Sequence, residues 1–174
     1  HTGEPYLVFT DTANRALPSW LKAKGLAIHG SNLCTEIFLP TSADRTAVCC
    51  LSSVNLEYFD EWKDDQNFIP DAMEFLDNVL QYFIEHAPET IARAKKSAER
   101  ERSVGLGALG FHAYLQKKGV PFESALAKSI NIRIFKHIQS ECARADAILC
   151  DLRGPCADAE EAGVKRRFSH WNAV

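Results

Sequence analysis

The stretch TAVCCLSSVNL, at residues 46–56, says most about the fold. It is rich in small and β-branched residues and carries no charged side chain, which is typical of a buried β-strand. The preceding PTSAD, at residues 40–44, has the composition of a loop. Downstream, the apolar residues change to a helical spacing. A strand followed by long helices predicts an α/β or α+β fold whose sheet is completed by sequence outside these 174 residues.

Helices are predicted for most of the downstream sequence. In the first of them, apolar residues recur at i, i+3 and i+4 from Met73 to Phe83, behind a cap at Asp71. A basic run at 93–102 is interleaved with acids, so we expect a solvent-exposed helix face there. The four expected helices cover residues 71–86, 88–102, 105–118 and about 124–150, and 151–174 have the composition of a loop. Upstream, we expect a strand-like run at 6–9, a turn or cap at 11–15, a short helix at 17–26 and irregular or extended chain at 28–37.

Composition narrows the class of protein. Hydrophobic residues make up 46% of the chain, enough for a sizeable core, and no repeat or boundary divides residues 1–174. The net charge of −3 favours neither nucleic acid nor a membrane surface as a partner, and no apolar run approaches the roughly 18–20 residues that span a bilayer. Without a signal peptide or an initial Met, we expect an internal piece of a longer cytoplasmic protein. Its six cysteines should be free thiols with at most one redox pair, and they are Cys34, Cys49, Cys50, Cys142, Cys150 and Cys156.

Two further patterns have plain structural interpretations. GLGALG, at residues 105–110, matches the GxGxxG pattern of dinucleotide-binding loops, but that pattern has this meaning only after a strand. Here a charged helical stretch precedes it and no second strand follows, so we interpret the glycines as a place of close helix packing. Neither the histidines nor the cysteines have the spacing of a metal site, and Cys142 and Cys150 are expected in the core.

The stretch SNLCTEI, at residues 31–37, places an amide, a thiol and a carboxylate at every second position. If the chain is extended there, Asn32, Cys34 and Glu36 share one face. A carboxylate disfavours a neighbouring thiolate, so the arrangement does not suit a thiolate nucleophile. It suits a thiol that stays protonated or reacts as a neutral radical, with Glu36 as general base and Asn32 as a hydrogen-bonding anchor. The alternative is a structural strand with a buried cysteine.

Cys49 and Cys50 lie on the next strand-like run, where neighbouring side chains point to opposite faces. One of the two thiols should therefore face the side of Cys34, and a thiol near a reactive thiol indicates redox chemistry. Two other functions stay open on the residues alone. One is a thiol–disulfide oxidoreductase that uses Cys34 with Cys49 or Cys50, and the other is a non-catalytic helical scaffold.

Five stretches carry a resemblance to a known family: GSNLCTEI, TAVCCLSSVNL, RSVGLGALGFHAYL, RGPCADA and RFSHWNAV. In their order and spacing, over essentially the whole chain, they resemble the large catalytic subunit of class I ribonucleotide reductase rather than the cobalamin-dependent form. The resemblance implies an α/β fold, part of a ten-stranded barrel with several packed helices and the catalytic cysteine on a central loop. It implies reduction of ribonucleotides to deoxyribonucleotides by a thiyl radical, in an allosteric, nucleotide-binding enzyme that provides precursors for DNA replication.

The resemblance also implies roles for single residues. Cys34 matches the cysteine that becomes the thiyl radical and removes the 3′ hydrogen of the ribonucleotide. Glu36 matches the base on the 3′ hydroxyl, and Asn32 matches the asparagine that hydrogen-bonds to the substrate. The backbone at Leu33 and Thr35 would lie against the substrate.

A redox cysteine and several partners follow from the same resemblance. Cys49, which follows the Ala-Val pair, matches one of two cysteines that end as a disulfide, and its partner is expected upstream of His1. No metal or cofactor bound directly by this chain is implied. The radical comes from a metallocofactor on a separate small subunit, and thioredoxin or glutaredoxin is the external reductant. A large-subunit dimer would act on ribonucleoside diphosphates, and we expect this chain to be inactive without the flanking parts.

Overall fold

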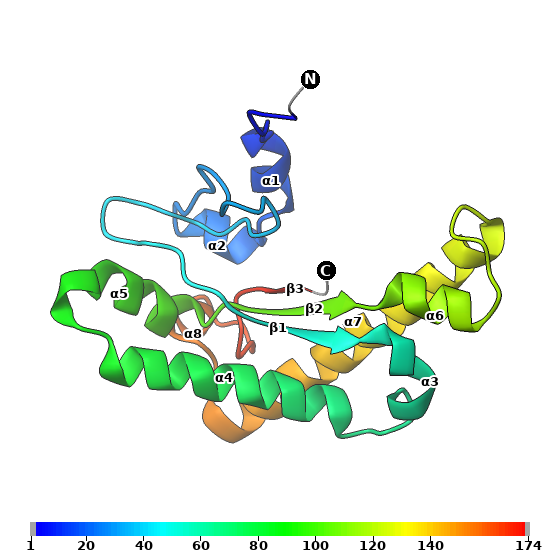
Figure 1. Cartoon of the computed structure of the whole chain (residues 1–174). Coiled ribbons are helices and arrows are strands. Elements are labelled where there is room, and N and C mark those ends of the chain that lie inside the picture. Colours follow the sequence, from blue (N-terminus) through cyan, green and yellow to red (C-terminus); the bar gives the residue numbers. More distant parts are fainter. Residues whose placement is uncertain (1–2, 173–174) are drawn as a thin grey trace.

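A parallel sheet lies at the centre of the chain (Figure 1). The computed structural model describes residues 3–172. Strands β1 (Cys50–Asn55), β2 (Val104–Leu109) and β3 (Trp171–Asn172) lie in that order across the sheet, and both neighbouring pairs are parallel. The strand predicted within 46–56 is confirmed as β1. Parallel strands joined by helical connections make this an α/β fold.

Three of the predicted helices are confirmed as α4, α5 and α7. Asp71 is not the cap of α4, because the helix begins three residues earlier and this carboxylate lies in its first turn, near the positive end of the helix dipole. α7 begins after Ser124, whose hydroxyl accepts a hydrogen bond from the Ala127 N–H at 3.1 Å. The helices are α1 (Thr10–Ala16), α2 (Ser19–Ala23), η1 (Leu56–Tyr58), α3 (Phe59–Trp62), α4 (Phe68–His86), η2 (Glu89–Ile91), α5 (Ala92–Glu101), α6 (Phe111–Lys117), α7 (Ala125–Arg153) and α8 (Ala157–Glu161).

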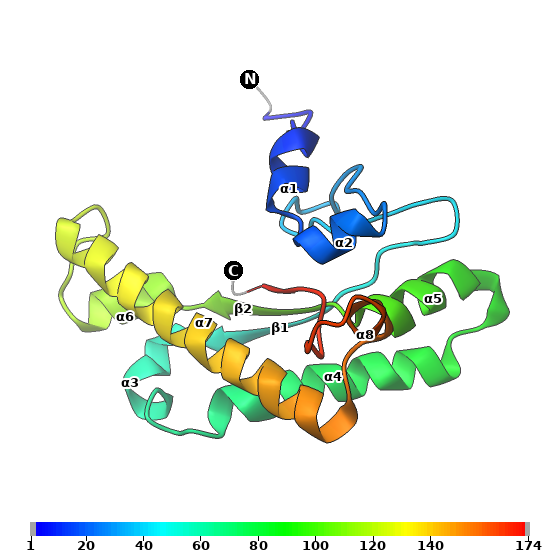
Figure 2. The same cartoon turned by 180° about the vertical axis from the view of Figure 1, so that it is seen from behind.

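The elements form layers on the two sides of the sheet. α4 covers one face of β1 and β2, and α7 packs against α4 (Figures 1 and 2). The main core fills this side and contains the predicted core residue Cys142, which is fully buried. Cys150 is also buried, as predicted, but it does not belong to this cluster. Residues 3–47 lie on the other side of the sheet (Figure 1). They have a small core of their own around Leu17, Leu21 and Ile28.

The helix predicted over 105–118 is wrong in its first part, which forms β2. The side chains that precede and follow each glycine of this strand belong to the main core, while the glycines take the opposite face. This period of two is hard to detect because glycine has no side chain. A Cβ on Gly105 would lie 2.3 Å from Leu51 Cδ2, so the glycine allows close packing beside β1 rather than between two helices. Gly110 then starts α6 with a φ of +78°.

The segments 6–16 and 151–172 differ from the sequence prediction, since helix replaces a turn in the former and a helix and a strand replace loop in the latter. Residues 6–9 form no strand, and the turn predicted at 11–15 belongs to α1. The short helix predicted within 17–26 is confirmed as α2, and it begins directly after Pro18. The tail at 151–174, predicted as a loop, contains α8 and β3. Elements this short carry no periodic signal, and β3 exists through its pairing with β2.

The basic run at 93–102 is only partly exposed, so that prediction needs correction. Arg93 and Lys96 are exposed as expected, but Arg102 is buried at the end of α5. Its Nη2 and Nε donate to Asp77 Oδ1 at 2.6 and 2.9 Å. Arg100 Nη2 lies 2.6 Å from Asp158 Oδ1. Both carboxylates are distant in the sequence, and a local charge pattern therefore gave no sign of them.

Asp77 is a fully buried carboxylate on α4 that three arginines surround. Besides Arg102, Arg153 Nη1 lies 2.7 Å and Arg167 Nη2 2.9 Å from Asp77 Oδ2. Burial opposes ionisation, but the three guanidinium groups outweigh it and hold the pKa of Asp77 below its usual value. These contacts join α4 to the ends of α5 and α7 and to the segment before β3.

Replacing Asp77 with asparagine should lower the free energy of unfolding by about 3–5 kcal/mol, because it leaves clustered guanidinium groups without their counter-charge. Urea unfolding followed by circular dichroism measures this. Glu74→Gln is the control, since it removes a more exposed carboxylate partner of Arg153 and should cost less than about 1 kcal/mol. Equal costs for the two variants would contradict the prediction.

Candidate active site

Residues 31–37 form a turn that the Asn32 side chain holds together. Asn32 Oδ1 accepts hydrogen bonds from the N–H groups of Glu36 at 3.1 Å and Ile37 at 3.0 Å. The Thr35 N–H donates to the Asn32 carbonyl at 3.1 Å. Thr35 has a φ of +65°, a left-handed conformation that β-branched residues rarely adopt. Backbone strain of this kind clusters at functional sites, so it singles out the turn.

Of the irregular or extended chain predicted at 28–37, the irregular form is found. The alternating faces of an extended chain are absent at this turn, because the Asn32 side chain accepts hydrogen bonds from two backbone amides and reverses the chain direction. The turn still brings two of the three predicted groups together, since Asn32 Nδ2 donates to Glu36 Oε1 at 2.6 Å. Cys34 and Leu33 are exposed at its tip. The alternative of a buried structural cysteine is therefore also wrong for Cys34.

Glu36 is half-buried, and its two oxygen atoms have different surroundings. Oε1 is held by Asn32, whereas Oε2 is buried and has no hydrogen-bond partner among residues 3–172. A carboxylate with one oxygen fixed and the other free is oriented to accept a proton from a bound group. This arrangement suits the general base that the sequence predicts at this position.

Cys49 and Cys50 point to opposite faces, as predicted. Cys49 lines a hollow together with Asn32, on the side of the turn, while Cys50 packs against the main core. Burial raises the pKa of the Cys49 thiol to about 12, and the nearby Cys50 and Glu36 act in the same direction. The Cys49 thiol therefore stays protonated at neutral pH.

Two adjoining hollows lie between the turn and the sheet. The larger has a volume of about 540 Å³ and is lined by Asn32 and Cys49 among others. The smaller, of about 210 Å³, places Glu36 beside small residues of the two central strands, namely Ser52, Ser53, Gly105 and Gly107. The sequence interpretation missed this role of the small residues. GxGxxG was the available signal, and it was assigned to helix packing.

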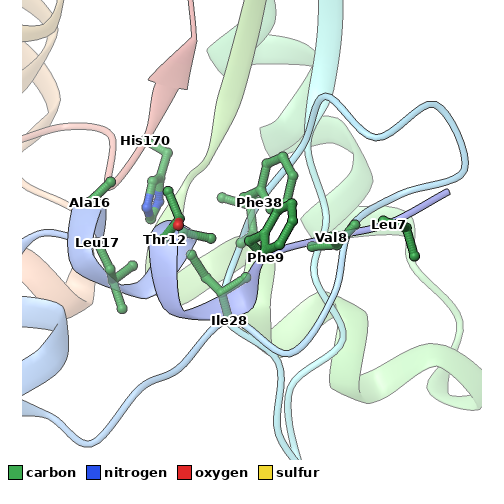
Figure 3. A pocket seen from close by; sticks show the side chains of 11 residues that line it. Leu7, Val8, Phe9, Thr12, Ala16, Leu17, Ile28, Phe38 and His170 are labelled. Atoms are coloured by element: carbon green, nitrogen blue, oxygen red, sulfur yellow. The ribbon is translucent and has the colours of Figure 1, made fainter.

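A third hollow, of about 510 Å³, lies against α1 and is mainly apolar (Figure 3). Its lining comes from α1 and the residues next to it, from Ile28, Phe38 and Leu39 in the loop after α2, and from His170. It includes none of the residues predicted to be catalytic. His170 Nδ1 is buried without a hydrogen-bond partner in the part of the chain that the structure describes. Burial, and then the charge of Arg166, lower the pKa of His170 to about 4.

This histidine should make stability depend on pH. An unfolded histidine titrates near pH 6.5. As the pH falls from about 6.5 to about 4, His170 becomes protonated in the unfolded chain but stays neutral in the folded chain. The free energy of unfolding that neutral His170 contributes is therefore fully present above this pH window and is lost as the pH falls through it. Between about pH 7.5 and pH 4, wild type should lose roughly 3 kcal/mol more unfolding free energy than His170→Gln. Parallel urea-unfolding profiles of the two proteins would contradict this, and exposed His29→Gln is the control.

The described residues also bear on disulfides, metal sites and membrane-spanning helices. All six cysteines are free thiols. Within residues 3–172, no group of three or more His, Cys, Asp and Glu side chains is placed to hold a metal ion. No helix in that range combines the length and apolar character needed to cross a membrane.

Three kinds of comparison with known proteins indicate the same family. The model of the ribonucleotide reductase barrel domain matches residues 1–174. The ribonucleoside-diphosphate reductase large subunit of Invertebrate iridescent virus 3 is 54% identical, covering 99% of this chain and 27% of that protein. The putative ribonucleoside-diphosphate reductase large subunit of Frog virus 3 is 53% identical, covering 99% of this chain and 31% of that protein.

A solved structure shows the same likeness. The Actinobacillus ureae class Id ribonucleotide reductase alpha subunit matches with a TM-score of 0.91 and 43% identity, over 98% of this chain and 32% of that chain. The chain thus spans about a third or less of the length of these relatives. The resemblance found in the sequence is confirmed, and the chain belongs to the ribonucleotide reductase barrel-domain family.

Proposed function

We propose that this chain is the central portion of the catalytic barrel of a ribonucleoside-diphosphate reductase large subunit and that it carries the radical site. The observation that carries the proposal is the turn at 31–37, where Asn32 orients Glu36 two residues from an exposed thiol at Cys34. The hollow beside this turn also contains Cys49. Family membership supports the reaction, since relatives of this chain are ribonucleoside-diphosphate reductase large subunits.

In the proposed reaction, a thiyl radical at Cys34 removes the 3′ hydrogen atom of the substrate and later returns it. Glu36 Oε2 accepts the proton of the 3′ hydroxyl while Asn32 holds the carboxylate and the substrate in place. The 2′ hydroxyl takes a proton from one of the two redox thiols and leaves as water, and Glu36 finally returns its proton to the 3′ oxygen. Cys49 and a second cysteine supply two hydrogen atoms and become a disulfide. One ribonucleoside diphosphate and one dithiol thus yield one deoxyribonucleoside diphosphate, one disulfide and one water.

We further propose that the sheet is a segment of a ten-stranded α/β barrel. β1 and β3 are the outer strands of the described sheet, so each has one side on which a further strand would pair. α4 and α7 lie on one side of the sheet, as helices do outside a barrel (Figure 2). The turn lies on the opposite side, which would be the interior, and there a radical would be shielded from solvent.

The proposed chemistry requires partners. A metallocofactor on a separate radical-generating small subunit supplies the radical, and thioredoxin or glutaredoxin re-reduces the disulfide. The flanking parts of the large subunit, which would itself dimerise, contribute the cysteine that pairs with Cys49. We expect the chain to be inactive without these parts.

A complementation assay tests the proposal. The assembled enzyme is this chain combined with the remaining segments of a large subunit and with the radical-generating subunit. Supplied with a dithiol reductant and a ribonucleoside diphosphate, it should form the deoxyribonucleoside diphosphate, and omission of this chain should stop product formation. A folded assembly that binds substrate and yields no product would contradict the proposal.

The same assay separates the two other functions that the sequence left open. A thiol–disulfide oxidoreductase would cycle its thiols in this chain without any nucleotide. A helical scaffold would tolerate loss of the Cys34 thiol in the assembled enzyme. We expect neither result.

A further inference from the structure

One buried carboxylate holds both ends of the segment that carries the turn. Asp158, on α8, has no exposed surface. Lys24, which precedes the turn, places Nζ 3.1 Å from Asp158 Oδ1 and also pairs with the exposed carboxylate of Glu161 on the same helix. Arg45, which follows the turn, donates two hydrogen bonds to the same carboxylate. Its Nη1 lies 2.6 Å from Asp158 Oδ2, and its Nη2 lies 3.1 Å from Asp158 Oδ1. The chain between these two cations contains residues 31–37.

Other contacts make the base of this segment rigid. The Thr41 N–H donates to the Ala27 carbonyl at 3.2 Å and closes the loop between them. Arg45 is 7% exposed, and its Nη1 also lies 2.9 Å from Glu101 Oε1. A bidentate, desolvated guanidinium–carboxylate pair fixes geometry better than an exposed ion pair. Arg100 holds Asp158 from α5, with Nε 2.9 Å from Oδ1, so the carboxylate itself cannot shift freely.

The tip of the turn, in contrast, is exposed, although the Asn32 side chain closes the turn itself. Leu33 is 88% exposed, Cys34 is exposed, and Thr35 holds a strained backbone conformation. Reacting groups need placement to within a fraction of an ångström, and a shift of about 1 Å can cost a hundredfold in rate. The hydrogen bonds of Asn32 fix the shape of the turn, whereas the position of the turn over the sheet must come from the stems of the loop.

We propose that Asp158 is a positioning residue for the candidate active site. It clamps Lys24 and Arg45, and through them it fixes the position of residues 31–37 over the sheet. Among the described residues, Asp158 contacts none of the groups proposed to react, so its effect on them is transmitted through the loop. The kinetic consequence of the clamp rests on the proposed function, whereas its effect on loop mobility does not.

Hydrogen exchange measured by mass spectrometry tests the clamp directly in this chain. Lys24→Met should raise amide exchange within residues 28–40 about tenfold or more and leave β1, β2, α4 and α7 unchanged. Arg153→Met is the matched control, because it also removes one partly exposed cation from a fully buried carboxylate that keeps two arginines. Unchanged exchange at 28–40 in Lys24→Met, or an equal rise in the control, would overturn the proposal.

Kinetics of the assembled enzyme provide the second readout. Asp158→Asn and Lys24→Met should lower kcat by about tenfold to a hundredfold, and Lys24→Arg should restore it, since it keeps the cation. A normal kcat together with a mobile loop would overturn the positioning role. If Asp158→Asn does not fold, the Lys24 variants decide. Normal turnover by Cys34→Ser would refute the proposed function instead, and the exchange result would still stand as evidence on the clamp.

Discussion

Cys34→Ser should lower deoxyribonucleotide formation by the assembled enzyme at least ~10⁴-fold, equivalent to a barrier about 5.5 kcal/mol higher. The reason is chemical rather than structural. Serine is nearly the size of cysteine, and the Cys34 side chain is exposed at the tip of the turn in this chain, so we expect the substitution to leave the fold of the chain intact. The hydroxyl does not form the oxygen radical under conditions that oxidise a thiol, and the 3′ hydrogen of the substrate then stays in place.

Cys50→Ser is the matched control for this experiment. It also replaces a thiol with a hydroxyl, close to the site in sequence, but Cys50 packs against the main core on the opposite face of β1. Its turnover should stay within about threefold of wild type, because a modest loss of stability does not change the chemistry of the folded enzyme. If Cys34→Ser turned over as fast as Cys50→Ser, the radical role of Cys34 would be refuted.

The helices of this fold were readable from the sequence where one face is buried over many turns. α4 and α7 have long apolar stripes, and the sequence located both of them to within a few residues. β2 could not be predicted from the sequence, because Gly105 and Gly107 occupy one face of it. The pattern GLGALG is equally compatible with a helix, a loop or a strand. Only its pairing with β1 decides between these outcomes. Such tertiary information is absent from a local pattern.

The candidate site was predictable in its chemistry but not in its shape. The amide, thiol and carboxylate of Asn32, Cys34 and Glu36 were visible as residue types. The alternating geometry was wrong, since one asparagine side chain can replace strand pairing with a turn. The clamp at Asp158 was invisible, because its partners Lys24 and Arg45 lie more than a hundred positions away along the chain.

Glu36→Gln should lower turnover by about 10²–10⁴-fold, the usual contribution of a general base. Glutamine keeps a carbonyl oxygen that can accept the hydrogen bond from Asn32 Nδ2, now 2.6 Å from Glu36 Oε1, and it keeps the backbone N–H that Asn32 Oδ1 accepts. The turn should therefore survive. What disappears is the basicity of the second oxygen, Oε2, which is buried and without a partner among the described residues.

The measurement that isolates this loss of basicity compares kcat and KM for wild type, Glu36→Gln and Asn32→Ala. Glu36→Gln should lower kcat with little change in KM, because the amide fills the same space against the substrate. Asn32→Ala removes the side chain that closes the turn, so it should affect both kcat and KM and should also raise amide exchange within residues 31–37. A wild-type kcat in Glu36→Gln would show that a group other than Glu36 accepts the proton of the 3′ hydroxyl. If Glu36→Gln and Asn32→Ala showed equal kinetic losses and equal amide exchange, the role of Glu36 would be only to support the structure of the turn.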